Sequence, residues 1–65
     1  MSEFRVGLKN GQYGYGSDSW QALKNAVGAK KAHVIATQIG YISSAHEIVA
    51  KNGVTIGFIE KRNKI

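Results

Sequence analysis

The chain has no cysteine and no proline, and its acidic residues are few: 65 residues carry 4 Asp and Glu against 9 Lys and Arg. Without cysteine there is neither a disulfide framework nor a thiolate metal site, which favours a reducing, cytoplasmic setting. No run of 18 apolar residues occurs, and the first residues contain no apolar stretch of signal length. We therefore expect neither export nor a membrane partner.

The scarcity of acids also bears on catalysis. General acid–base pairs and divalent-metal sites usually need two or more converging carboxylates. Two of the four acids, Asp18 and Glu47, are placed to cap helices. A dyad of Ser43 or Ser44 with His46 is an alternative, although serines in front of a helix are more typical of caps. We expect a non-enzymatic protein with no catalytic residue, metal or cofactor.

What the chain does have is positive charge. The net charge is +5 and the isoelectric point is near 9.8, which favours polyanionic partners such as nucleic acid. The length predicts one domain, residues 1–65, which buries only about 60% of the surface of its unfolded chain. Formation of a homodimer would bury more.

The first part of the chain predicts a β-hairpin. Apolar and other residues alternate over 4–9 and 12–16, with Asn10-Gly11 between them, the signal of a two-residue type I′ turn. In that register Lys9 pairs with Gln12 and Leu8 pairs with Tyr13. The expected core face then carries Phe4, Val6, Leu8, Tyr13 and Tyr15.

The remainder predicts alternating helices and strands. Asp18 with Gln21 approximates a capping box for a helix over 19–27, and Gly28 follows as its C-terminal cap. The β-branched run 32–37 predicts a buried strand, Ser44-x-x-Glu47 starts a second helix that ends at Asn52-Gly53, and 54–59 predicts the last strand. Residues 61–65 resemble a frayed basic tail. The predicted fold is α/β (α+β), of order ββαβαβ, with one mixed sheet, two helices and a right-handed parallel crossover.

Candidate binding residues follow from charge and from aromatic character. We expect contacts to nucleic acid from Arg5, Lys9, Gln12, Lys30, Lys31, Tyr41, Lys61, Arg62 and Lys64. Tyr41 follows Gly40 in an expected loop and is the best candidate for an exposed aromatic side chain. A stacking surface that also includes Tyr13, Tyr15 and Trp20 is an alternative to placing these three in the core.

The glycines before the first predicted helix have two interpretations. Gly11-x-x-Gly14-x-Gly16 could cradle a phosphate at the helix N-terminus, with help from Lys9 and Gln12. The spacing matches neither the Walker nor the dinucleotide pattern. A glycine-rich hairpin is the simpler explanation.

Residues 6–9, the stretch 28–37 and the segment 45–56 together resemble the distal half of an Mrr-type restriction-endonuclease-like domain, of the PD-(D/E)xK group. The resemblance places Lys9 at the family's lysine, but Gly7 stands where the metal-binding acid belongs. It therefore implies a non-catalytic relative that retains nucleic-acid or partner binding, with residual nuclease activity not expected.

The sequence thus favours a small, basic, non-enzymatic domain that binds the backbone of nucleic acid, with DNA or RNA unspecified. The alternative is a protein-binding module, or a homodimeric phage-type inhibitor of a host enzyme. Such a module would use the hairpin edge or an exposed patch around Tyr41 and Ile42.

Overall fold

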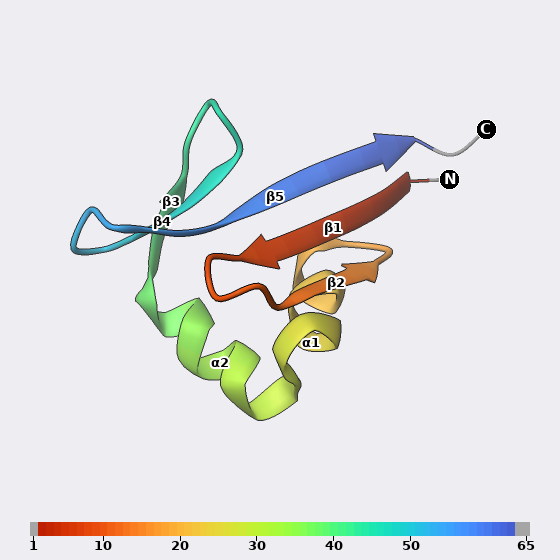
Figure 1. Ribbon diagram of the computed structural model, residues 1–65, viewed down its shortest axis with the longest axis horizontal. Helices are drawn as coiled ribbons and strands as arrows, with labels where there is room; N and C mark the ends of the chain where they lie inside the picture. The colour runs from red at the N-terminus through yellow and green to blue at the C-terminus, as the bar shows by residue number, and fades with distance from the viewer. Residues whose placement is uncertain (1, 64–65) are drawn as a thin grey trace.

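The computed structural model describes residues 2–63, which form a five-stranded sheet with two helices packed on one side (Figure 1). Along the chain the elements are β1 (Ser2–Leu8), β2 (Tyr13–Gly16), α1 (Ser19–Val27), α2 (Ala29–Gln38), β3 (Ile39–Ile42), β4 (Glu47–Ala50) and β5 (Thr55–Asn63). The strand order in the sheet is β2-β1-β5-β4-β3, and each neighbouring pair is antiparallel. The α+β class and the number of helices are confirmed, whereas the predicted ββαβαβ order, the mixed sheet and the position of the second helix are wrong.

The core lies between the sheet and the two helices. Val6 of β1 and Ile48 of β4 pack with Leu23 of α1 and Ile35 of α2, and each of these side chains is at most 9% exposed. Ala22 and Ala32 complete the buried cluster. Because strand side chains alternate between faces, the residues between these core positions lie on the opposite side of the sheet, which no helix covers. We call that side the open face.

Helix α1 begins and ends where the sequence predicts. The Asp18 side chain accepts a hydrogen bond of 2.7 Å from the backbone N–H of Gln21, and the N–H of Gly28 donates to the carbonyl of Lys24 at 2.7 Å. Gly28 has a φ of +89°, a conformation that glycine adopts at little cost. Both predicted caps of this helix are confirmed.

We expect Asp18→Ala to lower the free energy of unfolding by about 1 kcal/mol, because it removes the side-chain acceptor of an exposed helix N-terminus. Urea denaturation followed by circular dichroism measures the change. Ser17→Ala, one residue earlier and also exposed, is the matched control. Equal midpoints for the two variants would show that the cap contributes nothing to stability.

The β1–β2 hairpin forms as predicted, but its turn has three residues and not two. The N–H of Gly11 donates to the carbonyl of Leu8 at 3.0 Å, the N–H of Leu8 donates to Gln12 at 2.8 Å, and Gly11 has a φ of +94°. This is a type I turn followed by a glycine bulge. The register therefore shifts, so that Gly7 and not Leu8 lies opposite Tyr13.

A shift of one residue moves a strand's side chains to the other face of the sheet. Tyr13 and Tyr15 were expected in the core, and this expectation is wrong. Both lie on the open face, while the alternate positions Gly14 and Gly16 face α1. A Cβ on Gly14 would lie 2.4 Å from the backbone nitrogen of Ala26, and one on Gly16 would lie 2.5 Å from that of Ala22. Close contact between strand and helix accounts for these two glycines without a bound phosphate.

The predicted strand over 32–37 is instead part of α2. Ala32 and Ile35 are buried three residues apart, on one helical stripe, and Val34 between them is 53% exposed. A short apolar run is compatible with either a strand or one side of a helix. In this fold the five strands of the sheet come from other segments, and residues 32–37 form a helix that packs on the sheet.

The second predicted helix is also wrong, since its residues form a turn and the strand β4. The hydroxyl of Ser43 accepts from the N–H groups of Ala45 (3.2 Å) and Glu47 (3.1 Å), and His46 has a φ of +61°. These contacts cap a tight turn between β3 and β4. The parallel crossover is therefore absent, because β4 and β5 form an antiparallel hairpin.

The β4–β5 turn repeats the chemistry of the β1–β2 turn. Each contains Lys-Asn-Gly, at 9–11 and at 51–53, and in each the asparagine side chain accepts from the N–H two residues later, at 2.9 Å and 3.0 Å. Gly53, like Gly11, has a positive φ, here +87°. Asn52-Gly53 therefore connects two strands and does not end a helix.

Residues 61–63 were predicted to belong to a frayed basic tail, but they form the C-terminal part of β5. Lys61 pairs with Phe4 and Arg62 with Glu3, so residues 61–63 extend the sheet alongside β1. Figure 1 shows these two long strands side by side, with their ends close together. Lys64 and residue 65 lie outside the described residues.

Candidate binding site on the open face of the sheet

Aromatic and charged side chains form rows across the open face. One row runs from Tyr13 through Gly7 and Phe58 to Glu47, and the next runs from Tyr15 through Arg5 to Glu60. Tyr13 is 57% exposed and Phe58 is 50% exposed. Exposed apolar residues that lie next to one another often mark a binding surface.

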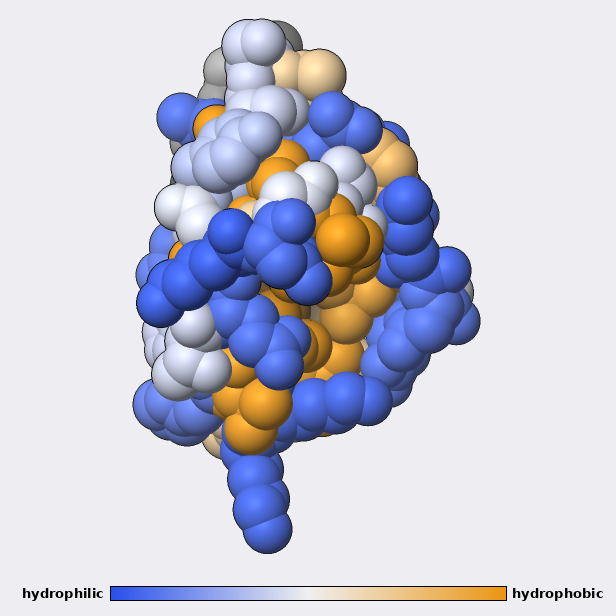
Figure 2. Space-filling model, turned by 90° about the vertical axis from the view of Figure 1, so that its left-hand side faces the viewer, coloured by the Kyte–Doolittle hydropathy of each residue, from blue (hydrophilic) through white to orange (hydrophobic). Residues whose placement is uncertain are grey.

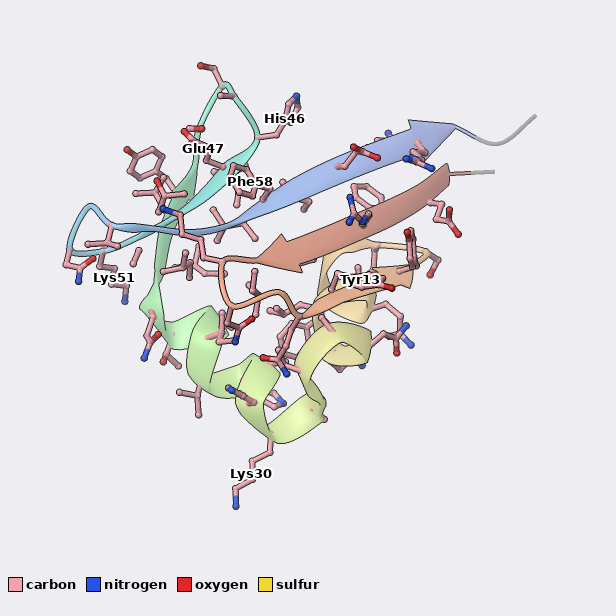
Figure 3. All side chains as sticks on the ribbon, viewed as in Figure 1. Tyr13, Lys30, His46, Glu47, Lys51 and Phe58 are labelled. Atoms are coloured by element: carbon pink, nitrogen blue, oxygen red, sulfur yellow. The ribbon has the colours of Figure 1, made fainter. Side chains whose placement is uncertain are left out.

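A groove of about 650 Å³ follows these rows. Gly7 forms part of its lining, together with Tyr13 from β2 and Phe58 from β5. The β3–β4 turn contributes His46, whose carbonyl accepts a hydrogen bond of 2.9 Å from the N–H of Ile59 and so joins the turn to β5. Figure 3 shows His46 and Phe58 on the side of the sheet away from the helices. The groove is lined by Arg5, Gly7, Leu8, Gly11, Gln12, Tyr13, Ala45, His46, Phe58, Ile59, Glu60 and Lys61.

Arg5 occupies a central position in the groove. Its guanidinium carbon lies 5.4 Å from the centroid of the Tyr13 ring, and that ring meets the Tyr15 ring edge to face at 6.0 Å. The Nε of Arg5 is buried and has no hydrogen-bond partner. A buried donor without an acceptor costs about 1–3 kcal/mol, so a shift of the Arg5 side chain that gave this N–H an acceptor on a ligand would be favourable.

The carboxylate nearest in register to Arg5 is already engaged. Glu60 lies opposite Arg5, but its Oε1 accepts a hydrogen bond of 2.6 Å from Nε of Arg62. This hydrogen bond, with the attraction of the Glu60 charge, raises the pKa of Arg62 above its ordinary value. Glu60 therefore neutralises Arg62, while the guanidinium of Arg5 lies over the Tyr13 ring.

Charge is segregated between the two sides of the sheet. By register, the chain's three glutamates and two arginines lie on the open face, which is therefore close to neutral. The described lysines lie in turns, on the helices, or, for Lys61, with the ammonium 5.8 Å from the centroid of the Phe4 ring. Among the described residues, the excess of positive charge thus comes from lysines in the turns, on the helices and at position 61.

The structure brings together only some of the residues predicted to bind. Arg5, Gln12 and Lys61 line the groove, and Arg62 lies on the open face in its pair with Glu60. The other predicted residues with described positions lie elsewhere: Lys9 in the β1–β2 turn, Lys30 and Lys31 in the first turn of α2, and Tyr41 on the edge strand β3. Figure 3 shows Lys30 pointing away from the sheet.

Among the groove residues absent from the predicted site are Gly7, His46 and Phe58, and Tyr13 appeared only in the alternative stacking surface. Tyr13 was assigned to the core because the turn was predicted one residue too short. Phe58 lies in an apolar run, residues 54–59, that shows no alternation. The sequence did contain a signal that Tyr13 lies on its own face of the strand. Because residues 14 and 16 are glycine, only the face of β2 that carries the tyrosines has side chains.

A second, smaller hollow lies at the end of the molecule that carries the two Lys-Asn-Gly turns. It measures about 260 Å³ and is lined by Leu8, Lys9, Asn10, Ile35, Gln38, Thr55 and Ile56. Figure 2 shows apolar surface in the middle of this end, bordered by hydrophilic residues. None of the exposed aromatic side chains lines this hollow, so we take the groove on the open face as the candidate site.

Within residues 2–63, no three His, Asp or Glu side chains come close enough together to hold a metal ion. In that same part of the chain, neither helix is long and apolar enough to cross a membrane. The segments on which the Mrr resemblance depends, 32–37 and 45–50, are helix and mainly strand, the reverse of the expected types. No protein-family model, curated protein or solved structure matches this chain, so its function must be inferred from the geometry of the open face.

Proposed function

We propose that this protein binds single-stranded nucleic acid, with bases stacked on the open face of the sheet. The observation that carries the proposal is the row formed by Tyr13, Gly7 and Phe58, with two half-exposed rings on either side of an open position. Unpaired bases expose both faces of their rings and stack on aromatic side chains, at about 1–3 kcal/mol per base. Bases inside a duplex are stacked on one another and offer no such face.

The charge distribution favours stacking over phosphate contact as the main source of affinity on this surface. A nearly neutral face gives little net attraction to a row of phosphates, although the Nε of Arg5 has no hydrogen-bond partner there. The net charge of +5 still attracts a polyanion at long range. In this proposal the lysines speed association, and the aromatic side chains and Arg5 hold the bound strand.

The proposal predicts a preference for single strands and a shallow dependence on salt. A fluorescein-labelled ten-residue oligothymidylate should bind more tightly than a duplex of equal length at about 50 mM salt. If Arg5 contacts one phosphate while Arg62 stays paired with Glu60, log Kd should change with log salt by about 0.7, the value for one single-strand phosphate. Fluorescence anisotropy at several salt concentrations measures both quantities. Absence of binding, or tighter binding of the duplex with a slope several times larger, would contradict the proposal.

A second candidate function, binding of a protein partner, is favoured by the edges of the sheet. The strands β2 and β3 each have one unpaired side. On β3, Tyr41 is 59% exposed and Ile42 is 47% exposed, and such edges pair readily with further strands. The simplest such partner is a second copy of the chain. Sedimentation equilibrium distinguishes nucleic-acid binding from self-association. A dimer whose formation is unaffected by oligonucleotide supports a protein-binding role. A monomer at all concentrations excludes self-association.

A further inference from the structure

We infer that the groove holds one base of the bound strand directly over Gly7, between the rings of Tyr13 and Phe58. This inference rests on the proposed function and adds the position at which a single nucleotide is held. It makes Gly7 the floor of the base site, the two rings its walls, and Arg5 the donor to the base or to its phosphate.

The spacing across the sheet suits a base between two rings. Gly7 is the register partner of both Tyr13 and Phe58, so the two aromatic residues lie two strand spacings apart, about 10 Å. Stacked aromatic pairs have ring centroids about 4.5–7 Å apart, and two such contacts in series span about 9–14 Å. Side chains stand roughly perpendicular to a sheet. The walls are therefore far enough apart to admit one planar ring and close enough for both to contact it.

Gly7 has no evident structural reason to be glycine. It is not among the glycines with positive φ, and a Cβ placed on it would meet no atom within 4 Å. By contrast, a Cβ on Gly14 or Gly57 would lie within about 2.5 Å of backbone atoms. Glycine within a strand weakens the sheet, and an aromatic neighbour sometimes compensates by covering it. Here neither ring comes within 4 Å of where a Gly7 Cβ would lie.

Arg5 gives the site a polar contact. Its Nε–H is buried and unpaired, two residues from Gly7 on the same face of β1, and the guanidinium lies beside the Tyr13 ring. Every natural base carries carbonyl or ring-nitrogen acceptors, and each nucleotide carries a phosphate. A nucleotide in the groove therefore supplies both the ring that the walls accept and the acceptor that Arg5 lacks.

The decisive variant is Gly7→Val, which fills the floor of the site without a clash at Cβ. Because a β-branched residue suits a strand better than glycine, its melting temperature should be equal to or higher than that of the wild type. Affinity for the labelled oligothymidylate should fall at least about tenfold, the effect of losing one stacked base. The affinity of Gly7→Ala should lie between that of the wild type and that of Gly7→Val. Ala36→Val, on the exposed side of α2, is the control for added bulk and should bind as the wild type does.

The outcomes separate the two levels of the proposal. If the wild type does not bind oligothymidylate, the proposed function and this inference both fail. If the wild type binds and folded Gly7→Val binds equally well, the base site is overturned while binding elsewhere on the face still stands. Should Gly7→Val not fold, the wild-type complex decides by nuclear Overhauser effects between the Gly7 Hα protons and base protons. Their presence supports the site and their absence overturns it.

Discussion

Gly14→Ala is expected to lower the free energy of unfolding by about 3 kcal/mol. The added Cβ would lie 2.4 Å from the nitrogen of Ala26 and 2.6 Å from the carbonyl oxygen of Ala22, both in the backbone of α1. A helix backbone cannot give way as a flexible side chain can, so β2 and α1 must separate. Overpacking a core costs about 1–3 kcal/mol and sometimes more, and we expect the upper end here.

This loss is large relative to the total stability. At about 0.05–0.15 kcal/mol per residue, a domain of 65 residues has about 3–10 kcal/mol to lose. Urea titration followed by circular dichroism measures the change, with Gly7→Ala as a matched control on the neighbouring strand, where the Cβ meets open space. A Gly14→Ala midpoint as high as that of Gly7→Ala would mean that α1 does not lie against β2 as described.

The double variant Tyr13→Ala/Phe58→Ala is expected to lower the affinity for single-stranded oligonucleotide by about 100-fold or more. It removes both walls of the groove, and each lost stacking contact is worth about 1–3 kcal/mol. Because both side chains are at least half exposed, the fold should lose little stability. Anisotropy titration of labelled oligothymidylate gives the affinity, and a thermal melt of the same sample verifies folding.

Two controls make this prediction specific. Tyr41→Ala removes an aromatic side chain of similar exposure, 59%, that does not line the groove, and it should change the affinity less than about threefold. Lys30→Gln/Lys31→Gln removes two charges from the helix side and should also have a small effect at moderate salt. A larger loss for the lysine variant than for the aromatic double variant would move the binding surface to α2.

The sequence predicts α1 well because independent signals agree there. Trp20, Leu23 and Val27 recur at helical spacing, Asp18 caps one end, and Gly28 caps the other. The local preference and the buried stripe point to the same structure. Tertiary contacts therefore did not have to override the local preference.

Elsewhere the local signals were ambiguous, and tertiary contacts decided the outcome. The run 32–37 has the composition of a strand, yet two small or branched residues three apart, Ala32 and Ile35, suffice for a helix to bury one stripe on the sheet. The pattern Ser44-x-x-Glu47 resembles a helix cap, yet only three residues follow before Lys51-Asn52-Gly53. A strand that pairs with β5 satisfies more backbone hydrogen bonds there than one isolated helical turn would.

The candidate site shows how one turn residue can hide a surface. Positive charge in a strand was enough to identify Arg5, which lies in the groove. Tyr13 was missed because Asn10-Gly11 predicts a two-residue turn, while the actual turn also includes Lys9. The one-residue difference exchanges the glycine and tyrosine faces of β2, and with them the core and the open surface.

The most direct test of a base-binding open face is a map of amide chemical shifts in ¹⁵N-labelled protein as oligothymidylate is added. We predict that the largest changes fall on Arg5, Gly7, Tyr13 and Phe58, with little change at Lys30 and Lys31. Changes centred on the first turn of α2, or spread evenly over the lysines, would contradict the account.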